Sequence, residues 1–335
     1  MAVKITPGAG GEYYIPYENR TGPESIVYFT RDLSPEGLRK VYRKLSGVLC
    51  GKVAVKLHTG EKNGPNIIPR PWVRELFEKE LSAFDDVSIV ETNTYYEGDR
   101  YTTEQHRETL EVNGWTFAPV DIMDEHGTAA LPVKNGKWFT EMIVGESLPS
   151  YDSFLALTHF KGHTQGGFGG SNKNIGIGCA DGRIGKKRIH TGEHAGQWAI
   201  SKEELAERIT ESTKATIDYF AGRIAYINVL RNMSVSCDCE GLGAMPVVTP
   251  NIGIVGSFDI LAADQASVDL VYALKEEDHK DLVERIESRH GLRQLTYMKE
   301  MGMGNDRYVL IDLDSEDECR ICPERAVEGV TPFAG

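Results

Sequence analysis

Short apolar runs alternate with stretches of helical periodicity along most of the 335-residue chain. The first strand-like run, residues 25–29, leads to a helical pattern that Ser34 would cap and that ends near Leu45. This alternation of strand and helix patterns is typical of β-α-β units and of a largely parallel sheet. The further strand-like runs are residues 52–57, 87–91, 154–157, 224–230, 252–255 and 308–313, and the further helical patterns are residues 69–84, 102–112, 202–220, 262–273 and 278–301.

One segment departs from this alternation. Asn135 and Gly136 stand between LPVK and KWF, and this pair is typical of the tight turn of a β-hairpin. We therefore predict an α/β fold with a mixed, mainly parallel sheet flanked by helices, an architecture that also allows two interlocked lobes. No repeat or change in composition divides the chain. We expect an irregular N-terminal segment (1–24), a single α/β domain (25–314) and an acidic, cysteine-bearing C-terminal tail (315–335).

The charge balance limits the partners that we expect. The chain has 50 acidic and 37 basic residues and a formal net charge of -13, which disfavours nucleic acid and anionic membranes. No run approaches the roughly 20 apolar residues of a membrane helix, and the first residues lack the apolar core of a signal peptide, so we expect a cytoplasmic protein. In that reducing compartment the six cysteines are expected to be thiols or metal ligands. The pattern does not specify an oligomeric state.

The segment 159–174, HFKGHTQGGFGGSNKN, combines many glycines with polar side chains. Its glycines would let the backbone approach a ligand closely. We predict that His159, His163 and Lys173 are catalytic, since they offer imidazoles for proton transfer and an ammonium group for an anion. The alternative is a structural turn with solvated histidines, and neither Walker nor Rossmann spacing is present. The predicted substrate-binding residues in this segment are Gly166, Gly167, Gly169, Gly170 and Asn174.

Three cysteines are predicted to form a metal centre. Cys237 and Cys239 follow the strand-like run 224–230, and two thiolates at this spacing can bind one soft metal or two irons of a cluster. Cys179 lies in IGIGCADG, where small residues would allow close packing against a cluster. A cubane on three cysteines would leave one iron open for water or substrate. The alternative is that Cys179 is an ordinary buried residue and that the other two occupy an exposed turn.

Two further cysteines form a C-x-x-C motif in the acidic tail. Cys319 and Cys322 have a spacing that can bind zinc or iron, or that can act as a redox dithiol. We rank this pair below the other three cysteines. If the tail folds back, the two thiols could join Cys237 and Cys239 in a four-thiolate zinc site.

Other candidates stand near the ends of predicted elements. Lys56 and His58 end the run 52–57 with matching strand parity, and ligands of open α/β sheets bind beyond the carboxyl ends of strands. We predict that both bind substrate. His190 is predicted to be catalytic, and it stands four residues before His194, a spacing that would place both on one helix face. The basic residues near His190 could steer an anionic substrate or an electron donor to the site.

These motifs resemble a family of uncharacterised iron–sulfur-centre proteins, grouped under domain of unknown function 362. The resemblance is carried by GKVAVKLHTGE, HFKGHTQGGFGGSNKNIGIGCADGRIGK, SCDCEG and IGIVGSFDILAADQASVDLV, and it covers roughly residues 27–313. It implies an iron–sulfur cluster, expected to be 4Fe-4S, on Cys179, Cys237 and Cys239. It does not identify a reaction, and the cysteine-bearing tail departs from the usual ending of the family.

One segment also resembles the lactate racemase family, whose nickel-pincer cofactor is attached to a lysine after a histidine- and glycine-rich segment. Lys173 follows His159 in a similar way and His190 matches a later histidine, although the glycine spacing differs. This likeness implies a covalent cofactor on Lys173 and acid/base work by the two histidines.

We predict a cluster-dependent oxidoreductase that acts on a small anionic substrate. Two alternatives stay open at this point. The first is a racemase, epimerase or lyase that depends on a metal or a pincer cofactor, and the second is a non-enzymatic carrier that serves an electron-transfer protein. Zinc and a nickel-pincer group are the alternative cofactors.

Overall fold

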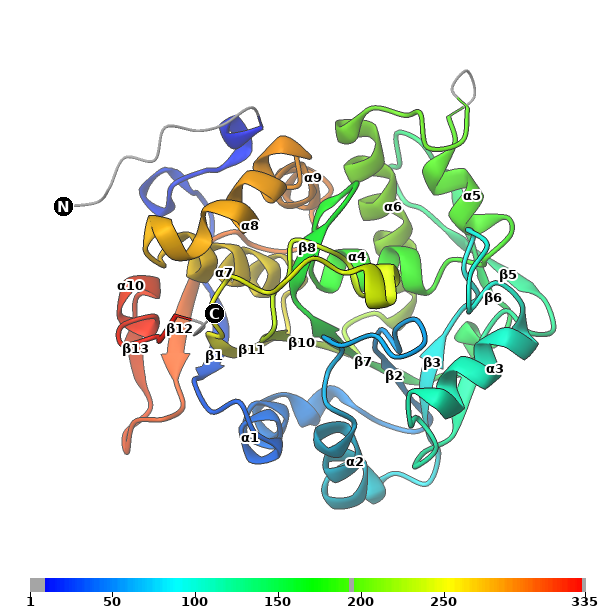
Figure 1. Cartoon of the computed structure of the whole chain (residues 1–335), viewed down its shortest axis with the longest axis horizontal. Helices are drawn as coiled ribbons and strands as arrows, with labels where there is room; N and C mark the ends of the chain where they lie inside the picture. Colours follow the sequence, from blue (N-terminus) through cyan, green and yellow to red (C-terminus); the bar gives the residue numbers. More distant parts are fainter. Residues whose placement is uncertain (1–9, 193–195, 333–335) are drawn as a thin grey trace.

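A nine-stranded sheet with helices on both faces forms the centre of the computed structural model, which describes residues 10–192 and 196–332 (Figure 1). Its strands are β1 (Ser25–Thr30), β2 (Val53–Lys56), β3 (Val87–Glu91), β4 (Val120–Ile122), β7 (Ser153–His159), β10 (Ile224–Leu230), β11 (Gly253–Ser257), β12 (Tyr308–Asp312) and β13 (Cys319–Ile321). They follow the order β13-β12-β1-β11-β10-β7-β2-β3-β4. Most neighbouring pairs are parallel, and the antiparallel pairs are those of β11 and β13. The predicted mixed, mainly parallel α/β architecture is confirmed.

Helices cover the sheet in two layers, each with its own hydrophobic cluster. The layer on one face is made by α1 (Pro35–Leu45), α2 (Arg70–Lys79) and α3 (Thr103–Val112). The layer on the other face is made by α4 (Ser171–Gly178), α6 (Lys202–Phe220), α7 (Ile260–Tyr272), α8 (Glu276–Ser288) and α9 (Arg293–Glu300). Two short helices, α5 (Gly185–His190) and α10 (Pro323–Ala326), lie near the ends of the sheet (Figure 1).

Local sequence signals explain several helix boundaries. The Ser34 hydroxyl accepts a hydrogen bond from the Gly37 amide at 3.2 Å, and proline occupies the first turn of α1. Thr102 and Gln105 form a reciprocal capping box at the start of α3. The predicted helix 202–220 and the predicted strands 87–91 and 224–230 have the observed bounds, and the other strands differ from prediction by one or two residues at their ends.

The predicted helical segment 278–301 is two helices, α8 and α9. His290 adopts a φ of 51°, in the left-handed region, and this ends the helical path. The adjacent Gly291 packs against the backbone of Gly166 and Gly167, where a side chain would meet atoms at 3.0 Å. The break therefore lets the glycine-rich segment pack closely against the helical layer.

Two hairpins and an edge strand complete the fold. The predicted hairpin at Asn135 is confirmed, since β5 (Thr128–Pro132) pairs antiparallel with β6 (Glu141–Gly145). A second hairpin, β8 (Lys161–His163) with β9 (Gly167–Gly169), lies within the glycine-rich segment. The cysteine-bearing tail extends the sheet, because β13 pairs with β12.

The four parallel strands β10, β7, β2 and β3 end at the same edge of the sheet. The segments that follow them contain the SCDCEG motif, the glycine-rich segment, His58 and the loop after Glu91. Loops beyond the carboxyl ends of such strands are favoured positions for ligand sites. Among the described residues, no helix combines the length and the apolar character needed to cross a bilayer.

Candidate metal and substrate site

A pocket of about 400 Å³ lies beyond the carboxyl ends of β2, β3, β7 and β10. Each of the four strands leads into a segment that lines it. Its chemistry-bearing wall consists of Lys56, His58, Glu91, Tyr95, Tyr96, Arg100, Lys161, His163, Lys173, Asn174, Lys186, His190, Trp198, Cys237 and Cys239.

The cysteine turn packs directly on the β8–β9 hairpin. The Gly162 amide donates a hydrogen bond to the Ser234 carbonyl at 2.8 Å. A Cβ atom on Gly162 would lie 2.5 Å from the Val235 carbonyl oxygen, so a larger residue would separate the two segments. This approach places His163 beside Cys237 and Cys239.

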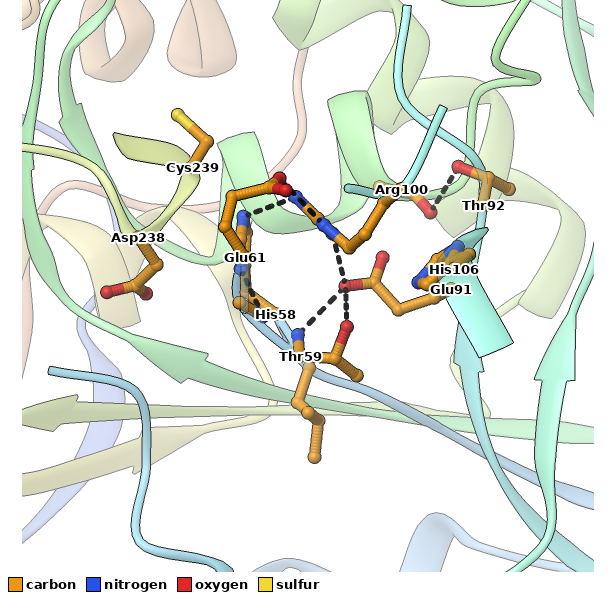
Figure 2. Close-up of polar contacts among 12 residues, drawn as sticks. His58, Thr59, Glu61, Glu91, Thr92, Arg100, His106, Asp238 and Cys239 are labelled. Carbon is orange, nitrogen blue, oxygen red and sulfur yellow. Dashed lines mark hydrogen bonds and ion pairs between the residues drawn. The ribbon is translucent and has the colours of Figure 1, made fainter. Parts of the chain in front are cut away.

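Asp238 orients the two thiols that flank it. Its buried carboxylate accepts hydrogen bonds from His159 Nδ1 and Lys161 Nζ, each at 2.9 Å. Figure 2 shows the Asp238 carboxylate and the Cys239 thiol on opposite sides of the turn. The ligand atoms of His163, Cys237 and Cys239 consequently lie within 4.8 Å of one another. This group could hold a metal ion.

The two cysteines share one proton in the preferred state of the pair. A hydrogen bond from the Cys239 thiol lowers the pKa of Cys237 well below its usual range, and Lys173 and His163 lower it further. The same hydrogen bond raises the pKa of Cys239. The turn therefore presents a Cys237 thiolate beside a Cys239 thiol, and thiolate is the form that binds soft metals.

Backbone amides donate to two pocket histidines. His58 Nδ1 accepts from the Gly60 amide at 3.0 Å, and His163 Nδ1 accepts from the Gly166 amide at 2.9 Å. In the neutral His163 ring the proton must then sit on Nε2. His58 Nε2 lies 3.4 Å from Arg100 Nη2, which can only donate, so the two contacts of His58 do not select one tautomer. Burial lowers the pKa of both histidines, and both are hydrogen-bonded to Cys237. The Nε2–H group of His163 therefore supports the thiolate.

His190 has the opposite arrangement. Its Nδ1 lies 2.8 Å from the Lys186 carbonyl, which can only accept, so Nδ1 carries the proton and Nε2 keeps a lone pair. Burial lowers the pKa of His190 to about 3. His190 is thus neutral near pH 7 and offers an acceptor in the pocket.

A buried charge network supports one side of the pocket. Lys56 Nζ contacts the Glu91 carboxylate at 3.0 Å and Asn174 Oδ1 at 3.1 Å. Arg100 contacts Glu61 at 2.9 Å and Glu91 at 3.4 Å, and Figure 2 shows it between these two carboxylates. Burial raises the pKa of Glu91, but Lys56 and Arg100 together hold it well below its usual range. The Glu91 carboxylate is therefore ionised and held between two cations.

Two ammonium groups of the pocket have no acidic partner of this kind. In the part of the chain that the structure describes, neither Lys173 nor Lys186 has a carboxylate oxygen within 4.0 Å. Lys186 donates to the Thr92 hydroxyl at 2.8 Å and to the Asn93 carbonyl, and burial lowers its pKa to about 8. The pocket thus carries positive charge that an anion can neutralise.

The model of the family described as "Domain of unknown function (DUF362)" matches residues 53–269, more than half of the chain. The chain belongs to the DUF362 family. The family predicted from the sequence motifs is confirmed, and all of the residues that line the pocket lie within the matched range.

Two solved structures are similar to this DUF362 protein. The lactate racemase apoprotein from Thermoanaerobacterium thermosaccharolyticum is 13% identical, with a TM-score of 0.43 over 79% of this chain and 59% of that chain. This chain thus spans less than two thirds of the length of that protein. A protein from Thermotoga maritima is 12% identical, with a TM-score of 0.36 over 58% of this chain and 50% of that chain. A search of curated proteins gives no match.

The DUF362 pocket brings together many of the residues predicted from sequence, but it leaves several of them outside. His159 lies beneath the turn, with Nδ1 on Asp238 and Nε2 2.6 Å from the Arg231 carbonyl. Gly166 and Gly167 pack against Gly291 instead of lining the wall. His194 lies outside the described residues. The predicted residues that line the pocket are Lys56, His58, His163, Gly169, Gly170, Lys173, Asn174, His190, Cys237 and Cys239.

Cys179 is separated from the other predicted metal ligands. It follows α4 in the hydrophobic core, where burial raises its pKa to about 12. In the described residues the metal-binding group contains His163, Cys237 and Cys239 without Cys179. Cys179 follows the glycine-rich segment in the sequence. Its sequence position does not indicate the direction in which its side chain points from the end of α4.

The tail cysteines are remote from the pocket. Cys319 begins β13 at the edge of the sheet, and three strands stand between β13 and β10. At about 4.8 Å per strand this separation is about 19 Å, many times a zinc–sulfur bond. The prediction of a four-thiolate site that combines Cys319 and Cys322 with Cys237 and Cys239 is therefore wrong.

Several pocket residues were missed by sequence reasoning. Tyr95, Tyr96 and Arg100 lie in the loop after β3, and their position after a strand end was the only available signal. Trp198 reaches the pocket through the segment after α5, where Thr191 bridges to Gln197. No spacing motif marks it.

Proposed function

We propose that this DUF362 protein is an enzyme that binds a soft metal on Cys237 and Cys239 and transforms a small anionic substrate. The observation that carries the proposal is the convergence of two thiols and His163 within 4.8 Å. This group faces a pocket that also contains the ammonium groups of Lys173 and Lys186. In the described residues these ammonium groups have no carboxylate within 4.0 Å, and soft ligands beside such cations suit a metal that works on an anion.

The donor set fits a single soft ion better than the predicted three-cysteine cubane. The turn supplies two cysteines, and the third predicted ligand, Cys179, lies apart from them in the hydrophobic core. His163 can become a ligand only if its Nε2 loses the proton that the backbone contacts place there. An iron–sulfur cluster at this turn would therefore need ligands beyond Cys237 and Cys239.

The chain's own residues have separable roles in this proposal. Lys173 and Lys186 bind the anion, and Asp238 holds the two thiols toward it. His190 Nε2 can accept a proton because its lone pair is free. A bound soft metal would supply Lewis-acid or one-electron chemistry.

Metal analysis after anaerobic purification tests the proposal. We expect about one metal ion per chain in the wild type, and its loss in Cys237→Ala and in Cys239→Ala with an unchanged circular dichroism spectrum. Cys179→Ala is the matched control and should keep the metal. Metal that persists in Cys237→Ala, or a wild type without metal, would contradict the proposal.

The same samples distinguish the possible centres. Iron with acid-labile sulfide and a paramagnetic signal after reduction would support the cluster-dependent oxidoreductase that the sequence led us to expect. Zinc, or iron without sulfide, would support a mononuclear centre. Loss of iron and sulfide in Cys179→Ala would instead restore the three-cysteine cluster.

A second candidate function is a racemase, epimerase or lyase that abstracts a proton. The acceptor at His190 Nε2 favours it, because a base must hold a lone pair that can take up the proton. His159 cannot serve as the partner base, since both of its ring nitrogens are engaged. Deuterium incorporation from D₂O into small carboxylic acids, lost in His190→Ala, would support this reaction. Conversion that requires an electron acceptor would oppose it.

A further inference from the structure

Three aromatic rings form one continuous wall of the pocket. Tyr95 and His190 are stacked, with ring centroids 6.3 Å apart and planes 22° apart. The Trp198 ring lies 5.4 Å from that of Tyr95 and 4.7 Å from that of His190. All three residues line the pocket, so the wall presents aromatic surface to any bound molecule.

The backbone holds Trp198 in an unusual conformation at this place. Its φ is 66°, in the left-handed region, which is an outlier for a bulky residue. Its amide nevertheless donates to the His190 carbonyl at 3.1 Å, beside the bridge between Thr191 and Gln197. The indole stays 39% exposed. Residues held in such sparsely populated backbone conformations cluster at active sites and ligand sites.

Positive charge stands in the same pocket. Lys173 lies at the start of α4 and is half-buried. Lys186 lies at the start of α5, the helix that ends at His190, and is buried. His190 is neutral, so the wall itself adds no charge. A volume of about 400 Å³ exceeds the roughly 150 Å³ of a cavity that holds benzene, which leaves space for a ring and an acidic group.

We propose that the substrate of this site is an anion that carries a flat, unsaturated or aromatic group. The flat group packs on Trp198 and Tyr95, and the anionic group contacts Lys173. This inference rests on the proposed function, because it assigns the substrate class of the same pocket. It assigns Trp198 a role in substrate specificity. Neither metal binding by the cysteines nor anion binding by the lysines requires this residue.

Calorimetric binding of two matched acids to the full-length protein tests the inference. Benzoate and cyclohexanecarboxylate have the same charge and similar size, but only benzoate has a flat π-system. We expect benzoate to bind about three- to tenfold more tightly to the wild type, the range of a favourable aromatic contact. Trp198→Leu should abolish this preference, and Trp198→Phe should keep part of it.

A third variant separates this inference from the proposed function. Lys173→Met should weaken both acids and leave their ratio unchanged. Equal affinities of the wild type for the two acids, with both dependent on Lys173, would overturn the flat-group inference alone. If both acids bind Lys173→Met as tightly as the wild type, the anion site itself is wrong. A preference for benzoate that survives in Trp198→Leu would also overturn the role of Trp198.

Discussion

Backbone contacts decide what two of the pocket histidines can do. His163 accepts an amide hydrogen bond at Nδ1, so its Nε2 atom is a donor, whereas His190 donates at Nδ1 and keeps an acceptor. Two imidazoles in one pocket thus divide into one donor that supports a thiolate and one acceptor. Residue type alone predicts none of these assignments, because a neutral imidazole can carry its proton on either nitrogen.

His106, a buried histidine outside the pocket, makes the stability of the folded protein depend on pH. Burial lowers the pKa of His106 to about 3, and its Nε2 has no hydrogen-bond partner in the described structure. The unfolded chain takes up this proton near pH 6.5, while the folded protein takes it up only near pH 3, so stability falls as the pH drops between these values.

His106→Gln should remove this contribution. We expect the free energy of unfolding to depend less steeply on pH between 4 and 6, by up to about 1.4 kcal/mol per pH unit. Urea unfolding at several pH values measures the slope. His126→Gln is the control, because the side chain of His126 is 82% exposed. An unchanged slope in His106→Gln would show that His106 is already protonated in the folded state.

At the level of elements, α4 connects the core to the pocket. Gly176 lies where α4 crosses α6, and a Cβ atom there would meet the Ile209 carbonyl oxygen at 2.4 Å. The start of the same helix carries Lys173 and Asn174, both on the pocket wall. The distance between α4 and α6 therefore also sets the position of the anion-binding ammonium group.

Gly176→Ala should push α4 away from α6. We expect a loss of about 1–3 kcal/mol in unfolding free energy, the usual effect of overpacking, together with weaker binding of benzoate. Thermal and urea unfolding measure the first effect and calorimetry the second. Gly47→Ala is the matched control, since nothing lies within 4 Å of its added Cβ. If the Gly176→Ala protein is as stable as the wild type, α4 can move away from α6 without a loss of unfolding free energy.

The sequence predicts some of these elements better than others, because some depend on local sequence patterns and others on packing between distant segments. α6 was predicted with its observed bounds, and in the structure the Ser201 side chain caps its first turn. The break at His290 was missed, since only the packing of Gly291 on the glycine-rich segment requires it. Strand ends located Lys56, His58 and the cysteine turn. Cys179 shows the limit of this approach, because its direction depends on how α4 rotates against α6.

On the scale of the whole molecule, the sheet separates two groups of cysteines. The pocket lies beyond β10, β7, β2 and β3, while Cys319 and Cys322 lie at the β13 edge. Both tail thiols are exposed. The tail cannot contribute ligands to the pocket without leaving the sheet.

The double variant Cys319→Ser and Cys322→Ser should therefore keep the metal content of the wild type. Metal analysis checks this, with Cys237→Ala as the positive control for loss. A metal content that falls by half or more in the double variant would mean that a second centre exists at the sheet edge. The thermal stability of the variant should change little, because both side chains are exposed.

The contrast between an acidic surface and a cationic pocket has a kinetic consequence. The chain carries a formal net charge of -13, yet among residues 10–192 and 196–332 no carboxylate lies within 4.0 Å of the Lys173 or Lys186 ammonium group. An approaching anion is repelled over long distances and attracted only at short range. Salt screens the long-range field within about 8 Å at physiological strength, while contacts inside the pocket are screened much less. Anions should therefore associate faster as salt is added, in contrast to ligands that a field of opposite charge steers to their sites.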